Sequence, residues 1–148
     1  MSRQLLRWAV VVAAFLGSIA MAAPASAATY RYPPNTLSPQ FRDGTCIYRI
    51  WYGNYGGTPF AKVRLYGGDC GELTVRVAGQ RGDLVDWYTA PRGYSGGQDS
   101  CGSYFEKQAT ANGAPAFAVG MQAYFPATGH DYVFWHDSGR QTTPYRYC

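Results

Sequence analysis

The sequence predicts an all-β fold, a small antiparallel β-sandwich or β-barrel of about eight strands. Apolar and polar residues alternate with a period of two in several short segments, and no segment after residue 27 has the 3.6-residue period of an amphipathic helix. Clusters of Gly, Pro, Asn and Asp separate these segments at intervals of about 8–12 residues, as turns do in such folds. The pattern alone leaves both the sandwich and the barrel open.

The first 27 residues have the pattern of an export signal. Arg3 and Arg7 form a basic start, the apolar run from Trp8 to Ala20 follows, and Ala25-Ser26-Ala27 is a small-residue cleavage site. The apolar run is shorter than the roughly 20 residues that cross a bilayer, so an uncleaved membrane anchor is the weaker alternative. We therefore expect a secreted protein, with a signal peptide at 1–27, an extended, proline-containing arm at 28–44 and a single β domain at 45–148.

The central stretch of the domain contains the clearest alternation. Two strands are predicted here, each with an apolar face and a polar face, and Gly67-Gly68-Asp69 between them predicts a hairpin turn. The apolar faces comprise Ala61, Val63 and Leu65 in the first strand and Leu73, Val75 and Val77 in the second. The polar faces comprise Lys62, Arg64 and Tyr66, and then Glu72, Thr74 and Arg76.

Further strands are predicted on either side of this stretch. Before it, Thr45–Gly53 places Cys46, Tyr48, Ile50 and Tyr52 on one face. After it, strands are predicted at Leu84–Ala90, at Ala116–Phe125 with Phe117 on its apolar face, and at Asp131–Asp137. Cys101–Ala109 is an ambiguous strand, and Pro91–Ser100 is predicted to be irregular because of its glycines.

The four cysteines are Cys46, Cys70, Cys101 and Cys148, an even number in a chain predicted to be exported. This combination is typical of two disulfides. Three pairings are possible, and we favour Cys46–Cys70 with Cys101–Cys148, which joins neighbours along the chain. No Cys-x-x-Cys or Cys-x-x-His pair is present, so neither a zinc site nor another cofactor is predicted.

The charge of the chain argues against two classes of partner. The formal charge is +4, and two of the cations, Arg3 and Arg7, lie in the predicted signal peptide. The remaining excess of positive charge is too small for a dedicated nucleic-acid-binding protein or for strong attraction to anionic membranes. We therefore expect an extracellular protein or a polysaccharide as the partner.

Four residues on predicted polar faces are the candidate binding residues: Arg49, Trp51, Arg64 and Tyr66. Binding surfaces favour Tyr, Trp and Arg because these side chains bury a large area at a low cost in conformational entropy. The alternative is that a further layer of the chain covers these residues. With no coherent catalytic set in the sequence, the main hypothesis is a binding module, such as an inhibitor of an extracellular enzyme or a component of the cell envelope.

Two other functions are considered. A small extracellular hydrolase would use His136 with a carboxylate from Asp137, Glu72 or Glu106. A carbohydrate-binding module would stack sugar rings on Trp51, Trp87 or Trp135.

The segment from Cys70 to Val77 resembles one strand of the tendamistat family of small secreted α-amylase inhibitors, which are disulfide-bonded β proteins. The family's inhibitory Trp-Arg-Tyr triplet has no counterpart in this chain, and the spacing of the cysteines differs. The resemblance therefore assigns no functional residue here.

Overall fold

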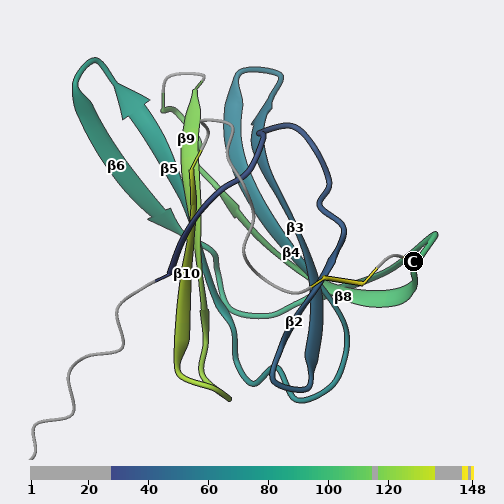
Figure 1. Ribbon diagram of the computed structural model, residues 1–148. Coiled ribbons are helices and arrows are strands. Elements are labelled where there is room, and N and C mark those ends of the chain that lie inside the picture. The colour runs from purple at the N-terminus through teal and green to yellow at the C-terminus, as the bar shows by residue number, and fades with distance from the viewer. Residues whose placement is uncertain (1–27, 115–116, 136–144, 147) are drawn as a thin grey trace, which may run out of the picture.

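Two β-sheets make up the fold in the computed structural model, which describes residues 28–114, 117–135, 145–146 and 148 (Figure 1). The five-stranded sheet has the order β1 (Ala28–Arg31), β10 (His130–Trp135), β9 (Ala118–Phe125), β5 (Thr74–Arg81) and β6 (Leu84–Thr89). The six-stranded sheet has the order β11 (Tyr145–Arg146), β2 (Gln40–Asp43), β3 (Cys46–Tyr55), β4 (Thr58–Gly67), β8 (Gly102–Thr110) and β7 (Ser95–Asp99). The predicted signal peptide lies outside the described residues.

All neighbouring strands are antiparallel except β1 and β10, which pair in parallel. The predicted all-β, mainly antiparallel fold is therefore confirmed, and it is a sandwich of two sheets. The described strands number eleven rather than about eight. The difference comes from short strands, since β1, β2, β7 and β11 span only two to five residues each.

The predicted hairpin around Gly67-Gly68-Asp69 is wrong, because β4 and β5 belong to different sheets. Each of these strands has one apolar face, and the two faces meet across the core instead of lying side by side in one sheet. Gly68 has a φ of +83°, and a Cβ there would lie 1.8 Å from the carbonyl oxygen of Thr45. The segment after β4 is therefore a tight crossover between sheets, which only glycine permits at this position.

Three other expectations differ from the structure. Residues 28–44 were expected to be an arm, but they contribute β1 and β2, and the side chain of Phe41 is fully buried. The stretch 91–100 was expected to be irregular, but it contains β7, whose Gly96 and Gly97 hide the strand pattern. Phe117 precedes β9 and is 49% exposed rather than part of the core face.

The core lies between the two sheets and is rich in aromatic rings. From the six-stranded sheet it receives Phe41, Tyr48, Ile50, Tyr52 and Val63, and from the five-stranded sheet Val75, Val77, Met121, Phe125 and Phe134. Tyr48 packs on Phe125 with ring centroids 4.6 Å apart, and thus joins the two layers. Burial of these side chains is the main stabilising contribution to the fold.

Both predicted disulfides are present. Cys46–Cys70 ties the first residue of β3 to the crossover between the sheets, and Cys101–Cys148 ties the tip of the β7–β8 hairpin to the last residue of the chain. No described cysteine is free. Two disulfides indicate folding in an oxidising compartment.

Candidate functional site

The four predicted binding residues share the outward face of the six-stranded sheet. Arg49 on β3 lies opposite Arg64 on β4, and Trp51 lies opposite Lys62. The predicted alternation therefore placed these side chains on the same face. Tyr66 continues this face toward the end of β4.

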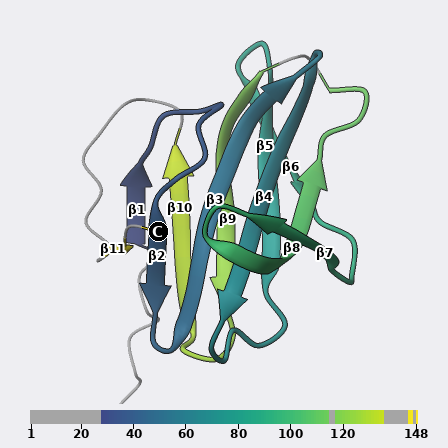
Figure 2. The ribbon, with the colours of Figure 1, turned by 90° about the vertical axis from the view of Figure 1, so that its right-hand side faces the viewer.

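The β7–β8 hairpin bends across this face and covers part of it, crossing in front of β4 to reach β3 (Figure 2). Its tip carries Asp99, whose carboxylate lies 2.8 Å from Arg64 and 3.6 Å from Arg49. Glu106 on β8 adds a second carboxylate, 2.8 Å from Arg64 and 3.5 Å from Lys62. The side chains of both arginines and both acids are only 12–15% exposed, so the arginines are partnered within the chain.

The electrostatics of this cluster fix its protonation states. Burial by itself would raise the pKa of Asp99, but hydrogen bonds from Tyr66, the Cys101 N–H and Arg64, together with the charge of Arg49, lower it below its usual value. Burial, followed by the hydrogen bond to Asp99, raises the pKa of Tyr66 to about 12. At neutral pH the carboxylate is therefore charged and the phenol neutral, which is the combination that holds the hairpin down.

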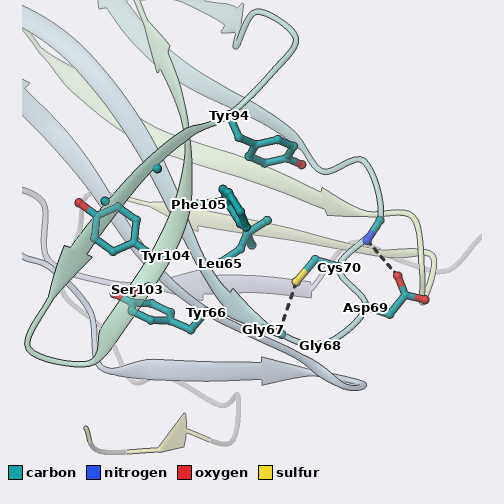
Figure 3. Close-up of a pocket in the computed structure, with 13 residues that line it drawn as sticks. Leu65, Tyr66, Gly67, Gly68, Asp69, Cys70, Tyr94, Ser103, Tyr104 and Phe105 are labelled. Atoms are coloured by element: carbon teal, nitrogen blue, oxygen red, sulfur yellow. Dashed lines mark hydrogen bonds between the residues drawn. The ribbon is translucent and has the colours of Figure 1, made fainter.

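A hollow of about 730 Å³ lies between the hairpin, the end of β4 and the crossover to β5. Tyr66, Tyr94, Tyr104 and Phe105 are among the residues that line it (Figure 3). The hydroxyl of Tyr66 already donates to Asp99, and that of Tyr94 accepts a hydrogen bond from the Leu73 N–H. The hollow therefore has aromatic walls with few polar groups left to orient a ligand.

A second hollow, of about 510 Å³, lies on the same outward face near the β3–β4 turn. Trp51, Tyr55 and Phe60 form its aromatic part, and the indole of Trp51 meets Phe60 edge to face at 5.3 Å. The hairpin tip does not contribute to its lining, which comes from β3, β4 and β8. Of the four predicted residues, only Trp51 lines this hollow.

The outward face of the five-stranded sheet carries a row of residues that crosses four strands. Trp135 on β10 pairs with Gly120 on β9, Gly120 with Ala78 on β5, and Ala78 with Trp87 on β6. The two small residues leave room for the indoles, whose centroids are 6.0 Å apart at an angle of 71°. A Cβ at Gly120 would lie 2.6 Å from the carbonyl oxygen of Phe134 and 3.0 Å from the Trp135 ring, so this position requires a residue without a side chain.

Polar side chains form the neighbouring row on the same face. Arg76 donates to Gln122 Oε1 at 3.3 Å, and Gln122 Nε2 donates to Asp131 Oδ2 at 2.6 Å. The guanidinium of Arg76 also lies over the Trp87 ring at 5.6 Å. The three polar side chains line a hollow of about 220 Å³ together with Thr74 and the 41%-exposed Tyr124. Arg76 Nε and Asp131 Oδ1 are buried and have no hydrogen-bond partner among the described residues.

We call these two rows the tryptophan face: Arg76, Trp87, Gln122, Asp131 and Trp135. Trp87 and Trp135 were sequence candidates for sugar stacking, whereas Arg76, Gln122 and Asp131 were not singled out. Alternation placed Arg76 on a polar face, but only the strand register shows that three polar side chains from β5, β9 and β10 converge.

The one histidine among the described residues lies beside a carboxylate, away from the tryptophan face. His136 lies outside the described residues, but His130 Nδ1 lies 2.6 Å from Asp43, a carboxylate that is 2% exposed and also accepts from Thr128 and Tyr132. This pair links β10 of one sheet to β2 of the other. A general base needs a substrate within hydrogen-bond reach, and His130 lines none of the three hollows described above.

The two glutamates form ion pairs with different residues. Glu106 pairs with Arg64, whereas Glu72 lies 3.2 Å from Lys107, a buried lysine of β8. They therefore do not form a pair of acids around one hollow. Within the described residues there is no cluster of three or more His, Cys, Asp or Glu side chains suited to a metal ion.

Comparison with known protein families, with curated proteins and with solved structures found no match to this chain. The described residues contain no helix long and apolar enough to cross a membrane.

Proposed function

We propose that this chain is a secreted, non-catalytic binding module that takes polysaccharide on the tryptophan face. The observation that carries the proposal is the adjacency of two indoles to a row of arginine, glutamine and aspartate side chains. The export signal pattern at 1–27 and the two disulfides support an extracellular location.

The aromatic row suits the faces of a sugar ring. A pyranose presents C–H groups on its faces, and these pack on an aromatic ring, where apolar contact is strong and little side-chain entropy is lost. Trp87 and Trp135 are both partly exposed on the outward side of the sheet, on strands that flank β5 and β9. The β-sheet fixes their spacing before any ligand arrives, which lowers the entropic cost of binding.

The row of polar side chains suits the hydroxyl groups at the edge of the sugar ring. Sugar hydroxyls both donate and accept hydrogen bonds, so they need partners of both kinds. Arg76 supplies donors, Asp131 supplies acceptors and Gln122 supplies one of each.

The face of the six-stranded sheet is a weaker candidate for the primary site. Its arginines are already neutralised by Asp99 and Glu106, and the hairpin covers them. A ligand there would have to break ion pairs that are largely shielded from water, which costs several kcal/mol.

The test is depletion of the purified protein from solution by insoluble cellulose, chitin, xylan and peptidoglycan. We expect at least one of these to retain the protein, and Trp87→Ala to weaken retention by roughly tenfold or more, because aromatic anchors dominate such contacts. Gln122→Ala weakens it as well while leaving the indoles in place. The matched control is Phe105→Ala, which removes a 64%-exposed ring from the other sheet and should leave retention unchanged.

Two results would contradict the proposal. One is retention that neither Trp87→Ala nor Gln122→Ala weakens, in proteins whose far-UV circular dichroism is native. The other is no retention on any of the four polysaccharides together with capture of a protein partner, which would favour the enzyme-inhibitor or envelope-protein function instead.

A further inference from the structure

The hollow beside Trp51 has the same two kinds of lining group as the tryptophan face, on the opposite side of the sandwich. Two of its rings differ in role: Phe60 is 5% exposed and supports Trp51 from the edge, whereas Tyr55 is 82% exposed and has its faces open to solvent. Partly buried Trp51 and exposed Tyr55 thus provide aromatic surface at the wall and rim of the hollow.

Its polar groups are those that hydroxyls require. Gln108, Thr58 and Thr110 line the hollow and supply uncharged donors and acceptors. Lys62 is the single charged residue in the lining, and its ammonium lies 5.3 Å from the Trp51 ring centroid and 3.5 Å from Glu106. The Nε1 of Trp51 is buried and also lacks a partner among the described residues. The lining therefore presents mostly uncharged donors and acceptors beside apolar rings.

We propose that this hollow is a second saccharide site and that the module bridges two polysaccharide chains. The inference rests on the proposed function, because it takes the tryptophan face as the first site. The two sites lie on outward faces of different sheets, with the core between them. A single straight stretch of polysaccharide cannot lie flat on both faces, so occupation of both sites joins two stretches.

Bridging is measured by a two-step capture experiment. The polysaccharide that retains the protein is immobilised and saturated with protein, unbound protein is removed, and the same polysaccharide is added in a soluble, fluorescently labelled form. The native protein is expected to capture the label. Tyr55→Ala and Trp51→Ala should still be retained through the tryptophan face but capture roughly tenfold less label.

Two variants of the Trp51 hollow are used so that a loss of label capture can be distinguished from a loss of folding. Trp51 packs on Phe60, so its replacement perturbs the sheet, whereas Tyr55 is exposed and can be removed without leaving a cavity. Phe105→Ala is again the control and should capture label as the native protein does. Trp87→Ala should keep only the weaker retention that the Trp51 hollow provides, roughly tenfold below that of the native protein, and should also lose label capture.

The outcomes separate this inference from the proposed function. Undiminished label capture by Tyr55→Ala and Trp51→Ala would overturn the second site. The same result is expected if a dimer bridges the polysaccharide through its two tryptophan faces, so that explanation also overturns it. Loss of retention in Trp87→Ala, alongside that result, would leave the proposed function standing. Complete loss of retention in Tyr55→Ala, with Trp87→Ala unaffected, would overturn two-site bridging and would also remove the tryptophan face as the primary site.

Discussion

At the scale of single residues, Asp99 links several side chains on the outward face of the six-stranded sheet. Its carboxylate receives Arg64 and Tyr66 from β4, a charge from Arg49 on β3, and the N–H of Cys101 at 2.8 Å. One carboxylate thereby ties the hairpin tip to two strands. Hydrogen bonds to a charged group contribute more than neutral ones.

We expect Asp99→Asn to lower the free energy of unfolding by about 2 kcal/mol, because it replaces a charged acceptor that has several donors. Since the pKa of Asp99 is lowered on folding from its usual 3.8, its contribution is complete above about pH 5 and is lost as the pH falls through the folded value. Urea unfolding of the native protein and of Asp99→Asn should thus show a constant difference in the free energy of unfolding from pH 5 to 8 and a smaller difference below pH 4. A difference that grows on acidification would contradict this account.

At the scale of elements, the β7–β8 hairpin depends on the placement of two glycines. Gly97 lies under Tyr104, and a Cβ there would approach the ring to 2.5 Å, whereas a Cβ at Gly96 meets nothing within 4 Å. Tyr104 in turn stacks on the Arg64 guanidinium at 4.4 Å. The hairpin can therefore lie flat on the ion-pair cluster only if residue 97 has no side chain.

We predict opposite effects for the two glycines. Gly97→Ala should destabilise the protein by roughly 1–3 kcal/mol, because the tyrosine ring must leave its position on Arg64. Gly96→Ala, the matched control, should be neutral or stabilising by up to about 1 kcal/mol, since alanine restricts the unfolded chain. Thermal unfolding of both variants measures the difference, and equal melting temperatures would refute the packing role of Gly97.

The strands themselves are readable from the sequence, but their partners are not. Alternation identifies β3, β4, β5, β9 and β10 because each buries one face, and it also identifies β6, although no residue of that strand is fully buried. It did not reveal that β4 and β5 lie in different sheets, since a glycine-rich connection fits both a hairpin and a crossover. β7 was missed because glycine has no side chain to alternate.

The candidate sites depend on register, which one sequence does not specify. Trp87 and Trp135 were identifiable as outward-facing rings, yet their contact requires β5 and β9 to lie between them with Ala78 and Gly120 in the same row. Alternation correctly placed Arg49 and Arg64 on one face. Asp99 lies 35 residues after Arg64 in the sequence, and no local pattern predicts that it contacts the two arginines. Long-range contacts of this kind follow from topology.

At the scale of the whole molecule, two disulfides contribute to the stability of the fold. The two bonds close loops with sequence separations of 24 and 47 residues. On the chain-entropy model these loops stabilise the fold by about 3.5 and 4 kcal/mol as upper estimates, a large share of the stability of a small domain. We therefore expect the protein to need an oxidising compartment to reach its full stability.

This expectation is checked by producing the full chain in a secreting host. The mature protein should begin at Ala28, and alkylation under denaturing conditions should modify no cysteine. After reduction, the urea midpoint should fall strongly. Mass spectrometry and unfolding curves provide both readouts, and a product that retains residues 1–27 or has reactive thiols would refute secretion as a disulfide-bonded domain.

The indole pair over Gly120 and Ala78 also has an optical consequence. The chain has four tryptophans, of which Trp8 lies in the predicted signal peptide, so the emission of the mature protein would come from Trp51, Trp87 and Trp135 alone. Two transition dipoles 6.0 Å apart couple their excited states, which gives a paired band in circular dichroism that Trp51 does not share. The unlabelled protein is therefore expected to report on both proposed sites: a saccharide on the tryptophan face should alter the paired band, whereas one in the Trp51 hollow should shift only the fluorescence.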